Sequence, residues 1–152
     1  MTALKIGQKA PGISLPDQDG TPVSLADYAG RKVLLYFYPQ ASTPGCTTQA
    51  CVVRDALADL SCRGVAAIGI SPDPPARQKV FDDTYRLGFP LLCDLDRGVA
   101  TSYGVWGEKS RDGRTYMGII RSAFLVDEQG VIAQVWYKVN PDQTVANVLA
   151  SL

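Results

Sequence analysis

Residues 33–51 read VLLYFYPQASTPGCTTQAC and contain the strongest structural signals of the chain. The first part, residues 33–38, is an unbroken run of apolar and aromatic side chains with the length of a buried strand. Pro39 ends that strand, because proline has no backbone N–H to donate to a neighbouring strand. Pro44 suits the first turn of a helix, where the N–H would be unpaired anyway. The stretch therefore predicts a buried strand, a short loop and a helix.

Cys46 lies in the first turn of this predicted helix. Ser42 or Thr43 is expected to cap the helix, because a hydroxyl oxygen can accept a hydrogen bond from a free N–H group there. The other free N–H groups and the positive end of the helix dipole favour a thiolate over a thiol. Since the thiolate is the nucleophilic form, Cys46 is a candidate nucleophile. Its helix face is apolar, so we expect it to point to the core side of a pocket.

Cys51 follows Cys46 by five residues. In a regular helix this spacing turns the chain by about 500°, which leaves the side chains roughly 140° apart with a rise of about 7.5 Å. A disulfide needs Cα atoms closer than about 7 Å and converging side chains. If the two cysteines pair, the first turns of the helix must unwind. The spacing thus predicts a segment of low local stability.

The rest of the chain alternates strand and helix patterns. In the first half we expect an N-terminal hairpin before residue 30, the strand at 33–38, a helix to 63 and a strand at 65–70. A second helix starts within residues 71–75 and runs to about residue 87, followed by a strand at 90–93 and a helix from 96 to 103. The last part is expected to contain a polar loop at 108–114, a hairpin with strands at 119–126 and 131–139, and a closing helix from 141. In the second helix, Val80 is expected to be buried. The order predicts one α/β domain over residues 1–152, with a mixed central sheet covered on both faces.

The amino-acid composition limits the partners and the cellular location that can be expected. Fifteen basic residues balance fifteen acidic ones, so no nucleic acid or anionic membrane is indicated as a partner. Residues 1–7 lack the apolar core of a signal peptide, and no later run approaches the ~18 residues of a membrane span. A cytoplasmic location is therefore expected. In that reducing compartment, four cysteines are expected to be free, metal-binding or catalytic rather than a disulfide framework.

The absence of histidine excludes several chemistries. Neither a Ser-His-Asp triad nor a Cys-His pair can be built without it. The four cysteines do not form two close pairs with the spacing of a zinc site, and no glycine-rich phosphate loop is present. We therefore expect neither a metal nor a cofactor.

The motif Pro39-x-x-x-Thr43-x-x-Cys46 resembles the peroxidatic motif of the peroxiredoxins. A second cysteine at Cys51 is similar to the peroxiredoxin Q, or bacterioferritin comigratory protein, subgroup. Residues 103–109 (YGVWGEK) and 118–127 (GIIRSAFLVD) also resemble that subgroup, so the likeness covers nearly the whole chain. The resemblance implies a thioredoxin-like fold, with helices on both faces of a mixed sheet and an N-terminal β-hairpin extension.

The resemblance also implies a reaction and a set of roles. Cys46 would reduce hydrogen peroxide and organic hydroperoxides, becoming a sulfenic acid, and Cys51 would resolve it as an intramolecular disulfide. Arg121 would lie on a strand beside the site and hold the thiolate and the peroxide. Thr43 would orient the peroxide, and Pro39 would shield Cys46 from water. A thioredoxin-like dithiol reductant would recycle the protein, and no cofactor is implied.

Some residues depart from the family pattern or have simpler interpretations. Gln49 stands where the family usually carries glutamate, so the amide can hydrogen-bond Arg121 but supplies no counter-charge. Cys62 is not expected to partner Cys51, and Cys93, in a short apolar strand, is expected to be buried. The basic side chains of the polar loop, which are Lys109, Arg111 and Arg114, are interpreted as solvated.

Two alternatives to the peroxidase remain open from the sequence. One is a thioredoxin-type disulfide oxidoreductase, although the chain lacks a Cys-x-x-Cys pair. The other is a non-enzymatic redox sensor or binding module, in which a Cys46–Cys51 disulfide unwinds the helix and exposes a partner surface. Because a resolving cysteine in the same chain requires no dimer, a monomer is expected.

Overall fold

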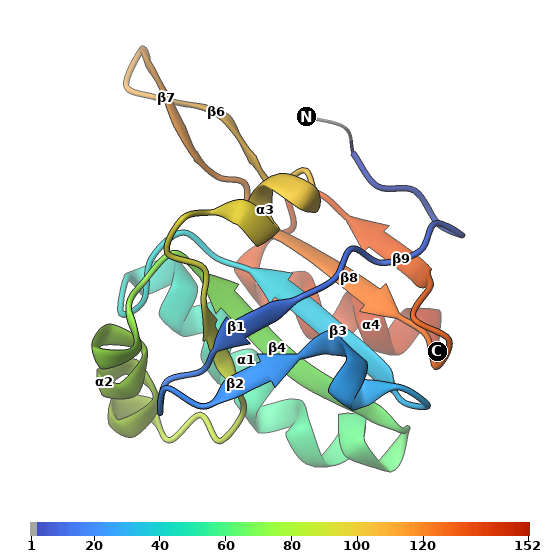
Figure 1. Ribbon diagram of the computed structural model, residues 1–152. Helices are drawn as coiled ribbons and strands as arrows, with labels where there is room; N and C mark the ends of the chain where they lie inside the picture. The colour runs from blue at the N-terminus through green and yellow to red at the C-terminus, as the bar shows by residue number, and fades with distance from the viewer. Residues whose placement is uncertain (1–2) are drawn as a thin grey trace.

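A five-stranded mixed sheet forms the centre of the molecule in the computed structural model, which describes residues 3–152 (Figure 1). In spatial order its strands are β5 (Leu91–Cys93), β4 (Val65–Ser71), β3 (Lys32–Phe37), β8 (Ser122–Val126) and β9 (Ile132–Trp136). β3 pairs in parallel with β4 and antiparallel with β8. Its side chains from Val33 to Phe37 are all buried, as the apolar run predicts.

Apolar layers cover both faces of this sheet. One layer is formed by α1 (Pro44–Cys62), α2 (Pro75–Tyr85) and α4 (Thr144–Ser151), which follows the short helix η2 (Pro141–Gln143). The other is formed by the N-terminal hairpin of β1 (Ser14–Pro16) and β2 (Pro22–Ser24), the short helix η1 (Leu25–Tyr28) and α3 (Gly98–Ser102). The predicted mixed sheet with helices on both faces and an N-terminal hairpin is therefore confirmed.

The connection from β3 through α1 to β4 determines where chemistry can occur. α1 packs against the sheet through Ala50, Val53 and Leu60, which are fully buried. β4 then returns parallel to β3, so the first turn of α1 lies beyond the carboxyl ends of two parallel strands. In α/β sheets this edge is where ligands usually bind, because helix N-termini and loops meet there. Cys46 belongs to that first turn.

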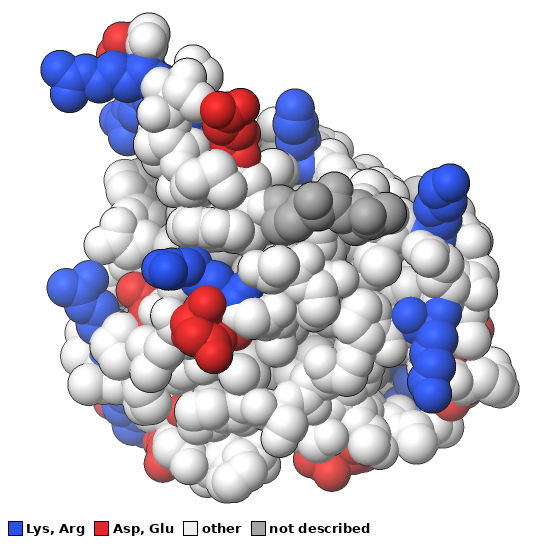
Figure 2. All heavy atoms as spheres, turned by 45° about the horizontal axis from the view of Figure 1, so that its top comes forward, with Lys and Arg blue, Asp and Glu red and all other residues white. Residues whose placement is uncertain are grey.

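The prediction of a polar loop at residues 108–114 is wrong. The segment forms a two-stranded hairpin of β6 (Trp106–Arg111) and β7 (Arg114–Ile119), which projects from the body (Figure 1). Asp112 and Gly113 have φ angles of 52° and 77°, as a two-residue hairpin turn with an Asp-Gly sequence requires. Basic side chains gather at its tip (Figure 2). Ile119 thus ends this hairpin, and the last hairpin begins only at Ser122.

The predicted burial of Val80 is also wrong, since 61% of its surface is exposed. α2 instead buries Gln78 and Phe81. The Phe81 ring lies 6.1 Å from the ring of Tyr38, and the Gln78 amide donates hydrogen bonds to Ser71 Oγ and to the Leu92 carbonyl. Polar contacts of a buried glutamine, which hydropathy patterning does not reveal, set the rotation of this helix.

The N-terminal segment lies against the last hairpin. Gly7 N donates to the Ile132 carbonyl, Ile132 N to the Gln8 carbonyl, and Ala10 N to the Gly130 carbonyl. The first two positions of the stretch considered for a signal peptide lie outside the described residues. Within residues 3–152, no helix combines the length and the apolar character needed to cross a membrane.

Candidate active site

Cys46 is the third residue of α1 and only 1% exposed. Arg121 approaches it closely, and Arg121 Nη2 donates to Cys46 Sγ at 3.4 Å. Contrary to the prediction, Arg121 does not lie on a strand: it is in the connection between β7 and β8, immediately before β8 begins. Its backbone carbonyl accepts a hydrogen bond from Val139 N at 2.9 Å, and its side chain lies beside the first turn of α1. A guanidinium at this distance places positive charge next to the sulfur.

Gln49 holds Arg121 from the other side. Arg121 Nη1 donates to Gln49 Oε1 at 2.7 Å, and Gln49 Nε2 donates to Thr144 Oγ1 at 2.9 Å. Gln49 and Thr144 are both fully buried, so water does not compete for the bond between them, whereas the bond from Arg121 is partly buried. The amide therefore orients the guanidinium without a counter-charge. The positive charge of Arg121 remains directed at Cys46.

The prediction that Ser42 or Thr43 caps α1 with its side chain is wrong. Thr43 occupies the N-cap position, but its hydroxyl donates to the Gln40 carbonyl at 2.8 Å and caps no helical N–H. Ser42 does not cap the helix either and has a φ of 66°. Thr43 and Pro39 line a pocket of about 400 Å³ together with Cys46 and Arg121. The structure thus brings four of the five predicted site residues together.

A buried polar network anchors this loop to the sheet. Ala41 N donates to Asp73 Oδ2 at 2.7 Å, and Ser71 Oγ donates to the same oxygen at 2.7 Å. Gln78 Nε2 donates to Ser71 Oγ, and Tyr38 Oη donates to Gln78 Oε1 at 2.6 Å. Buried networks in which the members satisfy one another restrict motion, so this one fixes the backbone between the end of β3 and Cys46.

Asp73→Ala is expected to lower the free energy of unfolding by about 1–3 kcal/mol, because two buried donors lose their acceptor. Urea denaturation followed by circular dichroism measures the change. The matched control is Asp83→Ala, which removes an exposed carboxylate of α2 paired with Lys79 and is expected to cost less than about 0.5 kcal/mol. Equal stability of Asp73→Ala and wild type would contradict the anchoring role.

Gly45 is needed for the approach of Arg121. A Cβ atom at this position would lie 3.1 Å from Arg121 Nη2, so an alanine displaces the guanidinium by a few tenths of an ångström. We expect Gly45→Ala to lower the rate of Cys46 oxidation by peroxide about tenfold. It should not lower the unfolding free energy, since alanine favours helix by about 0.5–1 kcal/mol over glycine. Stopped-flow oxidation and thermal unfolding test the two effects separately, and an unchanged rate would refute the steric argument.

Cys51, the fifth predicted site residue, is half-buried in α1 and does not line this pocket. Cys46 and Cys51 are both free thiols within one continuous helix. The helix geometry keeps them apart, so a bond between them requires the first turns of α1 to unwind.

The other two cysteines differ from each other in environment. Cys62 is exposed at the last residue of α1. Cys93 is buried in β5, as predicted, and burial together with the nearby Asp17 and Asp73 carboxylates raises the pKa of its thiol to about 11. A thiol with a raised pKa is a poor nucleophile at neutral pH.

The β6–β7 hairpin also contributes to this pocket, which the polar composition of the segment did not indicate. Trp106, Lys109, Arg111 and Tyr116 line it, although the basic residues of this segment were interpreted as solvated. Lys109 is half-buried, whereas Arg111 and Arg114 are exposed. The Asp112-Gly113 pair was the available signal, because it is typical of a two-residue hairpin turn and returns the chain toward the site.

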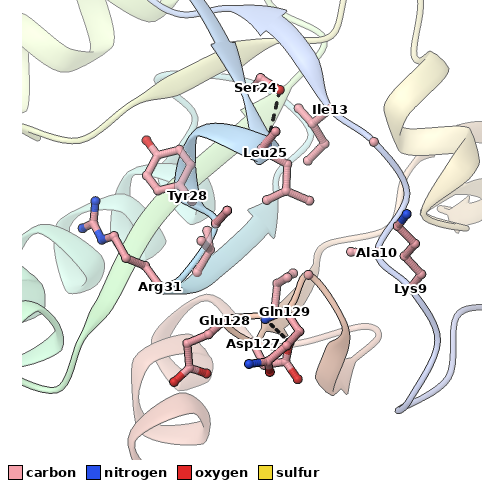
Figure 3. Close-up of a pocket in the computed structure, with 16 residues that line it drawn as sticks. Lys9, Ala10, Ile13, Ser24, Leu25, Tyr28, Arg31, Asp127, Glu128 and Gln129 are labelled. Atoms are coloured by element: carbon pink, nitrogen blue, oxygen red, sulfur yellow. Dashed lines mark hydrogen bonds between the residues drawn. The ribbon is translucent and has the colours of Figure 1, made fainter.

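A larger pocket, of about 580 Å³, lies near the opposite end of β3 (Figure 3). Ile13, Leu25 and Tyr28 line it, with Glu128 from the turn between β8 and β9. The Arg31 guanidinium lies over the Tyr28 ring at 5.5 Å. No cysteine is among the described residues that line this pocket, whereas Cys46 lines the smaller one, which is therefore the candidate site for thiol chemistry. No cluster of three or more histidine, cysteine or acidic side chains that suits a metal ion occurs between residues 3 and 152.

Comparison with known proteins extends these observations. Residues 6–135 match the AhpC/TSA family. Peroxiredoxin Bcp of Escherichia coli K12 is 51% identical over 136 residues, covering 90% of this chain and 87% of the relative. Peroxiredoxin Q of Xanthomonas campestris superposes with a TM-score of 0.86 at 33% identity, covering 91% and 88% of the two chains. Peroxidoxin BcpB from Mycobacterium tuberculosis has the same TM-score and identity, with 97% and 96% covered.

The fold is thus thioredoxin-like, and its helix-start cysteine beside an arginine is an arrangement that suits thiol redox chemistry. The chain belongs to the AhpC/TSA family. The resemblance to peroxiredoxins of the Q, or bacterioferritin comigratory protein, subgroup is confirmed by relatives that carry those names.

Proposed function

We propose that this protein is a thiol peroxidase that reduces hydrogen peroxide and organic hydroperoxides through Cys46. The contact between the Arg121 guanidinium and Cys46 Sγ in an open pocket is the observation that carries the proposal. The Cys46 thiolate attacks the terminal oxygen of the hydroperoxide. The S–O bond forms as the O–O bond breaks, which leaves a sulfenic acid and releases water or an alcohol. Arg121 stabilises the negative charge that develops in this step.

Cys51 completes the proposed cycle as the resolving cysteine. The Cys46 sulfenic acid condenses with the Cys51 thiol, releasing water and forming a disulfide. Since both residues lie in α1, the start of this helix unwinds in the oxidised state. A thioredoxin-like dithiol then reduces the disulfide by exchange. Pro39 and Thr43 line the pocket, where they are placed to shield the sulfur and to orient the peroxide.

The relatives support this function. The bacterioferritin comigratory protein of Xanthomonas campestris has alkyl peroxide reduction activity. It is 32% identical to this chain and superposes with a TM-score of 0.86. The family match and the names of the relatives favour a peroxidase over a non-enzymatic redox sensor.

We also propose that the protein acts as a cytoplasmic monomer. The proposed cycle starts from reduced thiols and needs a dithiol reductant, which suits a reducing compartment. The proposed disulfide lies within one helix, so it needs no second subunit. Sedimentation of the reduced and oxidised protein tests the monomer directly, and a dimer in either state would refute it.

The experiment that tests the cycle compares wild type with Cys51→Ser after one equivalent of hydrogen peroxide. Wild type is expected to lose two of its four thiols and to form an intramolecular disulfide, as intact mass and thiol titration report. Cys51→Ser is expected to accumulate a sulfenic acid on Cys46, trapped with dimedone, because no resolving thiol is within reach. Cys62→Ser, which changes an exposed thiol of the same helix, is the matched control and should behave as wild type. An intramolecular disulfide in Cys51→Ser would disprove the assignment.

A further inference from the structure

Lys109 reaches the peroxide pocket from the β6–β7 hairpin. It is half-buried, and its Nζ donates to the Ile119 carbonyl at 2.8 Å. Ile119 is the last residue of β7 and precedes Arg121 by two positions. The ammonium group is therefore held by a backbone carbonyl beside the segment that carries Arg121, and only one of its three protons is used there.

A glycine makes room for this lysine. In the hairpin Lys109 pairs with Tyr116, so Gly118 is its diagonal neighbour on the facing strand. A Cβ atom on Gly118 would lie 2.9 Å from Lys109 Cδ, closer than a real contact permits. The aliphatic stem of Lys109 thus lies across the glycine, which keeps the ammonium at the pocket rather than in open solvent.

The proposed reaction needs a proton that Cys46 and Arg121 do not supply. The terminal oxygen of the hydroperoxide keeps its hydrogen when it bonds to sulfur, so the departing oxygen leaves as an alkoxide or hydroxide unless it is protonated. Among the described residues of the pocket, none carries a carboxyl or imidazole group. A guanidinium does not release a proton in proteins. Thr43 already donates its hydroxyl hydrogen to the Gln40 carbonyl.

Lys109 and Tyr116 are the remaining proton donors of the pocket. Tyr116 is 44% exposed and has no hydrogen-bond partner that fixes its hydroxyl among the contacts of residues 3–152, whereas Lys109 is fixed at Ile119. Burial and the neighbouring Arg121 charge lower the pKa of Lys109, and Cys46 raises it by a smaller amount. A lysine with a lowered pKa is a better proton donor near neutral pH.

We propose that Lys109 is a catalytic general acid that protonates the departing oxygen, an inference that rests on the peroxidase function proposed above. As the Cys46 electron pair forms the S–O bond and the O–O bond breaks, the departing oxygen takes a proton from the Lys109 ammonium. The alcohol or water then leaves, and solvent water returns a proton to the neutral amine. The sulfenic acid stays on Cys46, so atoms and charges balance.

The test uses two substrates that differ in their need for an acid. Tert-butyl hydroperoxide releases a strongly basic alkoxide, while peroxyacetic acid releases acetate, which needs no proton at neutral pH. We expect Lys109→Gln to slow single-turnover oxidation of Cys46 by tert-butyl hydroperoxide about a hundredfold, and by peroxyacetic acid less than about threefold. Rapid-quench mass spectrometry gives both rates. Gly118→Ala keeps the lysine but displaces its stem, so the same selective loss is expected in a smaller degree.

A purely structural role predicts another pattern. If Lys109→Gln slows both substrates equally, or neither, the general-acid assignment fails while the peroxidase function stands. If the selective loss occurs in Tyr116→Phe instead, the phenol is the acid and the proposal is overturned. If neither substrate oxidises Cys46 in wild type, the peroxidase function fails together with it. Lys79→Gln, which neutralises an exposed lysine of α2 outside the pocket, controls for loss of a surface charge.

Discussion

Cys46→Ser is expected to lower the rate constant for hydrogen peroxide reduction by more than about a thousand-fold. The reaction needs a thiolate, and a serine hydroxyl at this position is neither ionised nor comparably nucleophilic. Serine is nearly the size of cysteine, so the buried position at the start of α1 is retained. Peroxide consumption with excess dithiol reductant gives the rate, and thermal unfolding checks that the variant is folded.

The matched control for this variant is Cys62→Ser, which changes an exposed cysteine at the end of the same helix. It is expected to consume peroxide at the wild-type rate. Should Cys46→Ser retain more than a few per cent of the wild-type rate while folded, another group must react with peroxide, and the catalytic assignment of Cys46 is lost.

Arg121→Met is expected to lower the same rate constant by about 10²–10³-fold. Methionine keeps part of the apolar stem but removes the donor to Cys46 Sγ and the positive charge next to it. It also leaves Gln49 Oε1 without its hydrogen bond from Arg121 Nη1, which is expected to reduce the unfolding free energy by about 1–3 kcal/mol. Stopped-flow oxidation of Cys46 and urea denaturation measure the two losses.

Two further variants separate charge from geometry at this position. Arg121→Lys keeps the charge but not the planar fork, so it should recover only part of the lost rate. Arg114 is an exposed arginine at the tip of the β6–β7 hairpin and does not line the Cys46 pocket. Arg114→Met is therefore expected to leave the rate unchanged. A wild-type rate in Arg121→Met would refute the role of the guanidinium.

Secondary structure was predicted correctly where a pattern within a few residues determines the backbone conformation. The strand, loop and helix around Cys46 were predictable because a continuous apolar run and two prolines restrict the backbone within a few residues. The hairpin of β6 and β7 also had a local signal in Asp112-Gly113, although the polar composition of its strands favoured a loop. Val80 shows the limit of periodicity, because a buried glutamine rather than an apolar side chain orients α2.

What the sequence by itself determined is the placement of a cysteine at the start of a helix that follows a buried strand. Both signals are local, and backbone sterics and N-terminal helix geometry act on them directly. No local pattern places a basic residue beside that cysteine: the family resemblance alone implied Arg121, and only the tertiary structure showed that Lys109 also lines the pocket. Arg121 is 75 residues from Cys46, and Lys109 arrives from another hairpin. Their positions depend on β8 pairing with β3 and on the direction of the β6–β7 hairpin. Such long-range pairing is set by the summed burial of many apolar side chains, which no single stretch of sequence contains.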